Sequence, residues 1–247
     1  MSNNEPVSAA ILVIGDEILS GRTKDKNIGT IADHLTAIGI DLMEVRVVGD
    51  RETAIIEALD ALRARYDYVF TTGGIGPTHD DITADAIAEA FGVTIDIDPA
   101  ARDLIAQLCE RRGVALTATR LRMARIPAGA SLIKNSISAA PGFMIGNVIV
   151  MAGVPVVMEV MLADVTPRLR TGQRMLSMTF DLNRPEGDIA EILSAQQQAH
   201  SDVAMGSYPS FREGRPTVQL VLRSRDPERL ALAGRNLEAA LKACDIL

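Results

Sequence analysis

Two adjacent carboxylates and three glycines share one short stretch of the sequence, Thr71 to Thr83 (TTGGIGPTHDDIT). The glycines lack the Cβ atoms that would keep a ligand away from the backbone, and consecutive N–H groups in such a loop form a concavity for an anion. Asp80 and Asp81 follow directly, and paired carboxylates bind a divalent metal ion or act as a general base. The stretch therefore predicts a site for a phosphorylated ligand.

Each feature of this stretch also has a structural explanation. Glycines also occur in tight turns that bind no ligand. One aspartate at a helix start caps the helix and interacts with its dipole, which stabilises the fold by roughly 0.5–2 kcal/mol. Because one aspartate suffices for that, we assign capping to Asp80 and chemistry to Asp81, although the order is reversible on the sequence alone. Three glycines with an acidic pair favour binding, in a loop that is neither a Walker loop nor a GxGxxG fingerprint.

Three consecutive β-loop-α units position this stretch. Apolar runs predict strands over residues 7–14, 41–48 and 67–72, and helical spacing predicts helices over 28–38, 52–65 and 82–91, with a loop over 15–27. Such units form a parallel sheet with helices on its faces, and ligands bind beyond the carboxyl ends of its strands. Asp16, Asp50, Asp80 and Asp81 all follow strands, so we expect them to meet at one edge.

The remaining sequence predicts further elements and a second domain. Helices are expected over 99–112 and 155–165 and short strands over 131–133, 143–145 and 148–151, whereas the basic segment 117–127 shows no period. Beyond a linker, strands over 175–182, 203–208 and 216–223 alternate with helices over 187–199 and 226–243. This β-α-β-β-α order indicates a small α+β domain of ferredoxin-like type, and we place the domain boundary between residues 168 and 169.

Composition limits the classes of function. The 247 residues carry a formal net charge of −7 and only 3% aromatics, which argues against nucleic-acid binding, membrane-surface binding and base stacking. Cys109 and Cys244 stand apart without metal-ligand spacing, and the sequence shows neither a signal peptide nor an apolar span, so we expect a cytoplasmic protein. Arg22, Lys24 and Lys26 either form a cationic rim for phosphate or an ordinary solvated loop.

Four motifs together resemble the molybdopterin-binding fold family shared by the molybdenum-cofactor adenylyltransferases. They are TTGGIGPTHDDIT, AAILVIGDEILSGRTKDKN, APGF and AGVP. The resemblance is greatest to the CinA-type branch, the competence/damage-inducible protein A N-terminal region, and covers essentially the whole chain. It implies a three-layer αβα domain with a mostly parallel sheet, whose glycine loop takes the phosphate of a pterin or nucleotide, followed by the small α+β domain of that branch. Similar domains accompany FAD synthases.

The resemblance also implies roles for individual residues. Asp81 and Asp50 match the two aspartates that carry metal-assisted chemistry, and Asp80 is a further candidate metal ligand from its position. The implied ligand-binding residues are Thr72, Gly73, Gly74, Gly76, Pro77, Thr78, Asp16, Glu17, Asn27 and Gly153. The expected cofactor is a divalent metal ion such as Mg²⁺, molybdopterin is one candidate ligand, and the expected assembly is a homo-oligomer, either a dimer or a trimer.

Three functions are compatible with this resemblance. CinA-type members look like metal-dependent pyrophosphatases that act on nucleotide pyrophosphates such as ADP-ribose, and this is our first hypothesis. Transfer of AMP to a pterin phosphate, and binding of a pterin or nucleotide without chemistry, are the alternatives. Ser138 and Ala152 stand where the family has glycine and proline, which affects the shape of a second loop. Full-length CinA proteins usually carry a C-terminal amidase domain for nicotinamide mononucleotide that is absent here, so deamidase activity is not expected.

Overall fold

The computed structural model describes residues 5–247, which form two compact units. The first unit ends at Gly172 and the second runs from Gln173 to Leu247. Leu169 is buried in the core of the first unit, and the backbone N–H of Arg170 donates to the hydroxyl of Tyr68 at 2.8 Å. These contacts keep residues 169–172 with the first unit, so the chain leaves it four residues beyond the boundary that the sequence suggested.

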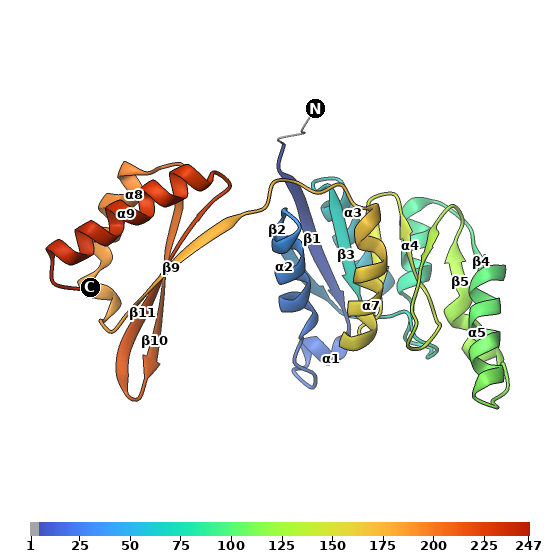
Figure 1. The fold of residues 1–247 in the computed structure, drawn as a ribbon. Coiled ribbons are helices and arrows are strands. Elements are labelled where there is room, and N and C mark those ends of the chain that lie inside the picture. Colours follow the sequence, from blue (N-terminus) through green and yellow to red (C-terminus); the bar gives the residue numbers. More distant parts are fainter. Residues whose placement is uncertain (1–4) are drawn as a thin grey trace. The chain divides into compact units, whose positions relative to one another are not determined.

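A six-stranded sheet forms the centre of the first unit (Figure 1). Its order is β2 (Ile40–Val48), β1 (Val7–Ile14), β3 (Tyr68–Thr72), β8 (Val148–Met151), β7 (Gly142–Ile145) and β6 (Ser131–Ile133). The first four strands are parallel to one another, and β7 runs antiparallel between β8 and β6. The expected mostly parallel sheet is confirmed, with β1 between β2 and β3.

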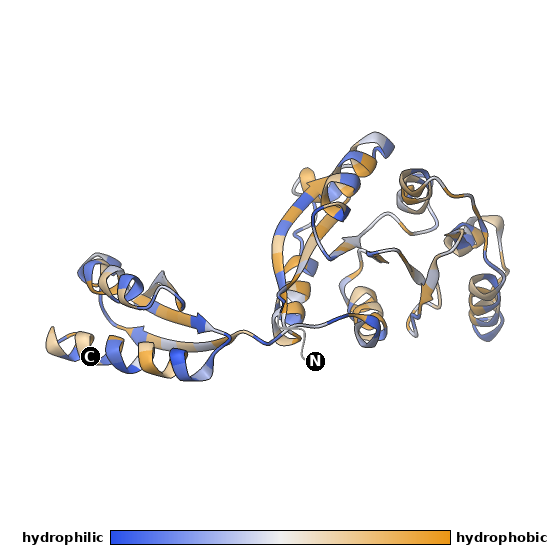
Figure 2. Cartoon of the chain, turned by 90° about the horizontal axis from the view of Figure 1, so that it is seen from above, coloured by the Kyte–Doolittle hydropathy of each residue, from blue (hydrophilic) through white to orange (hydrophobic). Residues whose placement is uncertain are grey.

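Helices cover both faces of this sheet. One face carries α2 (Asn27–Ala37) and α7 (Pro155–Val165), and the other carries α3 (Glu52–Arg63) and α4 (Thr83–Phe91), while α5 (Pro99–Arg111) joins the hydrophobic cluster of α3 and α4. Along β1, Leu12 packs on the α3 side and Ile11 on the α2 side, which explains the unbroken apolar run of that strand. Met158 and Met161 are fully buried core residues. Each helix in Figure 2 carries both apolar and polar residues, as expected when one face of a helix is buried.

Several short elements were missed by sequence periodicity. These are α1 (Asp16–Leu19), where a loop was expected, β4 (Ile95–Ile97), α6 (Ala118–Leu121), the 3₁₀ turn η1 (Arg122–Ala124) and β5 (Arg125–Pro127). Strand β4 pairs antiparallel with β5 as a separate two-stranded sheet. The segment 117–127, for which the sequence predicts no period, therefore has a defined structure: β5 pairs with β4, and α6 and η1 pack beside α5.

The second unit is a three-stranded antiparallel sheet with two helices. The strands lie in the order β10 (Ala204–Arg212), β11 (Arg215–Ser224) and β9 (Leu176–Leu182), and the helices are α8 (Ala190–Ala199) and α9 (Pro227–Ala243). Leu220 and Leu222 of β11 are buried against Leu230 and Leu237 of α9. The predicted β-α-β-β-α order is confirmed. Helix α8 begins three residues later than expected, because residues 186–188 form a 3₁₀ turn.

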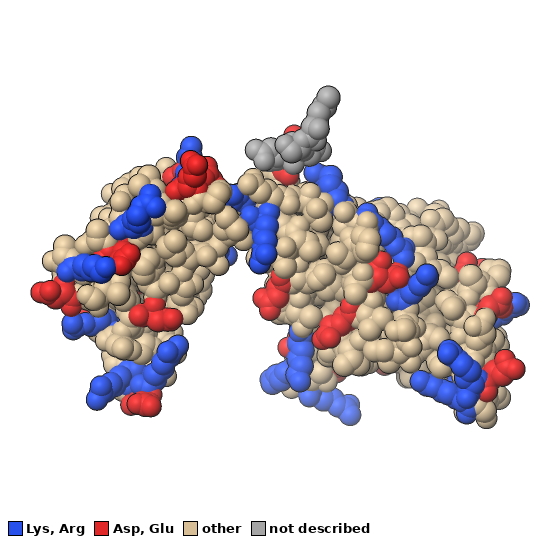
Figure 3. All heavy atoms as spheres, in the orientation of Figure 1, with Lys and Arg blue, Asp and Glu red and all other residues tan. Residues whose placement is uncertain are grey.

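Surface features add two observations. Among residues 5–247, no helix is long and apolar enough to cross a membrane. On the face shown in Figure 3, Lys and Arg side chains are interspersed with Asp and Glu, so neither sign of charge forms a continuous field there. Recognition of an anionic ligand therefore depends on local groups rather than on a charged face.

Asp67 links the beginnings of the neighbouring strands β1 and β3, and its carboxylate makes the stability of the fold depend on pH. Its carboxylate accepts hydrogen bonds from the backbone N–H and hydroxyl of Ser8, both at 2.8 Å, and from Arg170 at 2.5 Å. The bond from the Ser8 N–H is the main cause of a lowered pKa for Asp67. A lowered folded-state pKa contributes stability above the unfolded pKa, about 4, that is lost as the pH falls through the folded value.

We therefore expect Asp67→Asn to be less stable than the wild type at pH 6, with a difference that shrinks by pH 2 to 3. Urea denaturation at both pH values measures the two free energies of unfolding. Asp103→Asn is the matched control, because the Asp103 carboxylate is exposed on α5 and pairs only with neighbouring Arg102 among the described residues. An Asp67→Asn difference of equal size at both pH values would show that the carboxylate charge is irrelevant.

Candidate functional site

The glycine loop packs directly on the end of the neighbouring strand. Gly73 and Gly74 have φ angles of 104° and 65°, in the region that favours glycine. A Cβ atom at Gly73 would overlap the carbonyl oxygen of Ile14, the last residue of β1, and one at Gly74 would overlap the hydroxyl of Thr83 in α4. Both glycines are therefore required by conformation and by space, which brings the bare backbone to the edge of the sheet.

Two of the four N–H groups in this loop are already used by the protein. The N–H of Gly73 donates to the carbonyl of Met151 at 3.2 Å, and the N–H of Gly76 donates to Oδ1 of Asp81 at 2.7 Å. The N–H groups of Gly74 and Ile75 have no acceptor within the described chain. The expected anion site of residues 73–76 is thereby narrowed to two adjacent donors.

Asp81 holds the rest of the loop in shape. Its Oδ2 accepts the backbone N–H of Thr78 at 2.8 Å and also the Thr78 hydroxyl, while Oδ1 accepts from Gly76. A Cβ atom at Gly76 would lie 2.6 Å from Oδ2 of Asp81, so a larger residue there would displace the carboxylate that holds the loop. The loop therefore closes around a carboxylate of the protein itself.

The structural role expected of Asp80 belongs to Asp81. Asp80 was expected to cap the following helix, but α4 receives no side-chain cap from the described residues, and the Asp80 side chain is 62% exposed. Asp81 makes the structural hydrogen bonds instead. The expectation that Asp80 caps this helix is wrong, because the Asp81 carboxylate takes the loop N–H groups of Gly76 and Thr78 and Asp80 remains exposed.

Asp50 contacts the loop after β1 rather than the glycine loop. Its Oδ2 accepts the backbone N–H of Asp16 at 2.8 Å and so holds the first turn of α1. Strand β1 lies between β2 and β3, and two strand spacings separate the ends of β2 and β3 by about 10 Å. Asp16 and Asp50 are brought together, whereas Asp50 and Asp81 lie on opposite sides of β1.

Asn27 ties together the loops that follow β1 and β8. Its side chain is 4% exposed, its Nδ2 donates to the carbonyl of Gly153 at 2.8 Å, and its Oδ1 has no donor among residues 5–247. A Cβ atom at Gly153 would lie 3.3 Å from the Cα of Gly73. The loops after β1, β3 and β8 therefore meet closely, and Asn27 is the link between two of them.

These loops enclose a cavity of about 520 Å³. Of the residues expected to bind ligand or metal, six line it: Glu17, Gly73, Gly74, Gly76, Asp81 and Gly153. Thr72 and Asn27 line an adjoining cavity of about 60 Å³, together with Lys24 and Lys26. Asp16, Asp50, Pro77, Thr78 and Asp80 line neither cavity. The volume of the larger cavity suits a ligand of nucleotide or pterin size.

A loop that sequence reasoning did not assign to the site forms the opposite wall. Buried Asn135 donates from Nδ2 to Oγ of Ser138 at 2.6 Å and to the carbonyl of Ala140 at 3.0 Å, and its Oδ1 accepts the N–H of Ser138. Ala139 has a φ angle of 59°. Asn135 and Ser138 line the larger cavity. The APGF motif signalled this loop, but only the fold shows that Asn135 organises it.

The carboxylates suit a metal ion that arrives with its ligand. Within the described part of the chain, no three His, Cys, Asp or Glu side chains converge as a metal-binding group. Mg²⁺, however, prefers hard oxygen donors and usually takes only one or two protein carboxylates together with substrate phosphates and water. Glu17 and Asp81 both line the large cavity and have this chemistry. The donors therefore fit an ion that would arrive with a phosphorylated ligand rather than a closed resident site.

Removing the Asn27 side chain should loosen the site. We expect Asn27→Ala to lower the free energy of unfolding by about 1–2 kcal/mol, because the Gly153 carbonyl loses its hydrogen-bond partner in a buried position. Chemical denaturation measures this change, and Asn183→Ala, at an exposed position in the second unit, is the control. Equal stability of the two variants would contradict a structural role for Asn27.

Comparisons with known proteins agree with this geometry. The family described as "Probable molybdopterin binding domain" matches residues 10–171, and the family described as "FAD synthase, middle domain" matches residues 174–247. A CinA-like protein of Citrifermentans bemidjiense is 36% identical over 225 residues, which are 87% of this chain and 53% of that protein. A protein of Archaeoglobus fulgidus is 31% identical over 231 residues, which are 94% of this chain and 96% of that protein.

A solved structure shows a similar fold for the first unit. It is described as the protein CinA with unknown function from Thermoplasma acidophilum, and it is 34% identical with a TM-score of 0.60. The match covers 67% of this chain and 99% of that one. Together with the family match over most of the first unit, these likenesses show that the chain belongs to the molybdopterin-binding domain family and, within it, to the CinA-like proteins.

Proposed function

We propose that this protein binds a phosphorylated nucleotide or pterin in the 520 Å³ cavity and hydrolyses a nucleotide pyrophosphate such as ADP-ribose with the help of a divalent metal ion. One observation carries the proposal: the two N–H groups of Gly74 and Ile75 without protein acceptors lie in a loop that lines a cavity shared with Glu17 and Asp81. Such a pair of donors binds phosphate oxygens, and the carboxylates supply the acid–base and metal-binding groups.

The residues divide the chemistry among them. Gly74 and Ile75 hold one phosphate, Asp81 keeps their loop in shape, and Asp50 fixes the turn of α1 that carries Glu17. Glu17 is the candidate base that takes a proton from water, whose oxygen forms a new bond to one phosphorus while the bridging oxygen leaves with the other phosphate.

Asp81, which lines the cavity, remains a proposed metal ligand, since a carboxylate has lone pairs beyond the hydrogen bonds that Asp81 accepts from Gly76 and Thr78. Asp50 lies on the far side of β1 from Asp81 and lines neither cavity, so its proposed contribution goes through the α1 turn that carries Glu17. A bound divalent ion polarises phosphoryl oxygens and lowers the pKa of water.

Binding without chemistry is the second candidate. It is favoured by the hydrogen bonds that Asp81 accepts from Gly76 and Thr78, because these bonds account for the carboxylate without any catalytic role. In this case the cavity would hold a nucleotide or pterin, and Asp81 would serve only to shape the loop.

Product analysis separates these functions. The protein is incubated with ADP-ribose and Mg²⁺, and nucleotides are separated by chromatography. Hydrolysis gives AMP and ribose 5-phosphate in equal amounts, and EDTA stops it. A binding module gives saturable binding in calorimetry without products. Incubation with ATP and a pterin phosphate tests AMP transfer in parallel. Absence of both binding and products for ADP-ribose would contradict the proposed function.

A further inference from the structure

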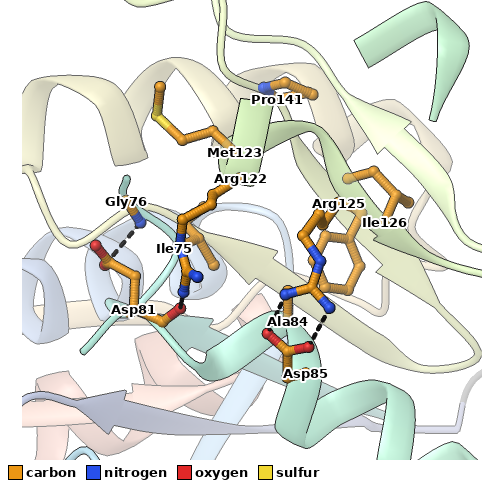
Figure 4. A pocket seen from close by; sticks show the side chains of 12 residues that line it. Ile75, Gly76, Asp81, Ala84, Asp85, Arg122, Met123, Arg125, Ile126 and Pro141 are labelled. Carbon is orange, nitrogen blue, oxygen red and sulfur yellow. Dashed lines mark hydrogen bonds and ion pairs between the residues drawn. The ribbon is translucent and has the colours of Figure 1, made fainter. Parts of the chain in front are cut away.

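Arg122 lies beside the glycine loop with most of its hydrogen-bonding capacity unused. The side chain is half-buried in η1, and its Nη2 donates to the backbone carbonyl of Asp81 at a long 3.4 Å (Figure 4). Its Nε is buried without an acceptor in the described chain. A buried N–H donor such as this Nε is costly to leave without an acceptor, and a guanidinium carries five such donors in all. The protein therefore presents a cation whose partners it does not itself supply.

The neighbouring arginine shows the contrast. Arg125 forms a two-pronged ion pair with Asp85 of α4 at 2.8 and 2.6 Å, and Figure 4 shows both interactions. Arg122 has no ion-pair partner among residues 5–247. Lys24 and Lys26 belong to the adjoining 60 Å³ cavity. Arg122 is thus the guanidinium beside the glycine loop that is available to an anion.

Arg122 lines a small hollow that shares part of its wall with the ligand cavity. The hollow holds about 20 Å³, and Gly74, Ile75, Gly76 and Asp81 line both spaces. This volume suits one phosphoryl oxygen or a water molecule rather than a whole ligand. A ligand in the large cavity therefore reaches Arg122 with a phosphoryl oxygen rather than with its bulk.

We propose that Arg122 binds the second phosphate of a diphosphate ligand whose first phosphate lies on the N–H groups of Gly74 and Ile75. The inference rests on the proposed function, because it assumes that the glycine loop binds phosphate. It narrows the ligand class to nucleoside diphosphates and their esters over monophosphates. A planar guanidinium suits this task, since it binds phosphate oxygens through two parallel hydrogen bonds.

Calorimetric titrations with AMP and with ADP test the proposal at fixed Mg²⁺ and ionic strength. We expect the wild type to bind ADP more tightly than AMP. Arg122→Gln should weaken ADP binding by about tenfold to a hundredfold, the range for a lost charge-assisted hydrogen bond, and AMP binding by less than about threefold. Arg122→Lys should lie between, because it keeps the charge and loses the planar fork.

The matched control is Arg120→Gln, two residues away. The Arg120 guanidinium is bonded to the carbonyl of Ala115 and lines neither space. It should leave the ADP to AMP ratio unchanged. Equal weakening of AMP and ADP by Arg122→Gln would mean that Arg122 only supports the loop, and no weakening would mean that it plays no part; either result overturns the inference while phosphate binding stands. A wild type that binds neither nucleotide overturns both the inference and the proposed function.

Discussion

Gly73→Ala is expected to lower the free energy of unfolding by about 2–4 kcal/mol and to abolish ligand binding. The φ angle of 104° is strained for any residue with a Cβ atom, and that atom would overlap the carbonyl oxygen of Ile14. Ile14 ends the central strand β1 and Gly73 directly follows the central strand β3, so the backbone at neither residue can shift without disturbing the sheet. Urea denaturation measures the stability, and calorimetry with AMP measures binding.

The variant Gly92→Ala separates the effect of backbone strain from the effect of steric overlap in Gly73→Ala. Gly92 ends α4 with a φ angle of 63°, and apart from its neighbours in the chain no atom of the described residues lies within 4 Å of a Cβ built there. This variant loses only the conformational preference, for about 1 kcal/mol, and should keep full binding. If Gly73→Ala proves no less stable than Gly92→Ala, the close approach of the glycine loop to β1 is not the reason for this glycine.

Asp81→Asn is expected to reduce ADP-ribose turnover by at least about a hundredfold and AMP affinity by about tenfold. The amide has one acceptor oxygen, so its NH₂ group would face either the N–H of Gly76 or that of Thr78, and one loop hydrogen bond is lost. The loss of charge also removes a proposed metal ligand. Turnover reports both effects, whereas affinity reports mainly the shape of the loop.

The two readouts decide between an enzyme and a binding module. An enzyme loses far more turnover than affinity, whereas a binding module loses affinity and has no turnover to lose. Asp103→Asn, on exposed α5, is the control and should match the wild type in both. An Asp81→Asn variant with unchanged affinity would show that the carboxylate does not shape the loop. An unchanged rate would remove Asp81 from the chemistry.

The long elements were predictable because their patterns repeat. Helix α3 buries Ile55, Leu59 and Leu62 at helical spacing, and β1 is apolar throughout because both of its faces are covered. Strands β4 and β5 and helix α6 have three or four residues each, which is too few to show a period. Strands β4 and β5 form because they pair with each other, and pairing across about thirty residues leaves no local signal.

The edge that carries the site was predictable, but its detailed geometry was not. Aspartates after parallel strands must lie at the carboxyl ends of those strands, and Asp16, Asp50 and Asp81 do. Strand order decides which of them meet, and β1 lies between the strands that lead to Asp50 and Asp81. The hydrogen bonds of Asp81 depend on how the loop turns back at Gly76, which the order of residues does not specify.

The most direct measurement is an amide NMR titration of the protein with ADP in the presence of Mg²⁺. If the glycine loop binds phosphate through its available donors, the N–H resonances of Gly74 and Ile75 show the largest downfield proton shifts, while that of Gly76, bonded to Asp81, moves little. Saturation of both shifts at a common dissociation constant would support the site. Saturable ADP binding that leaves Gly74 and Ile75 unshifted would contradict it.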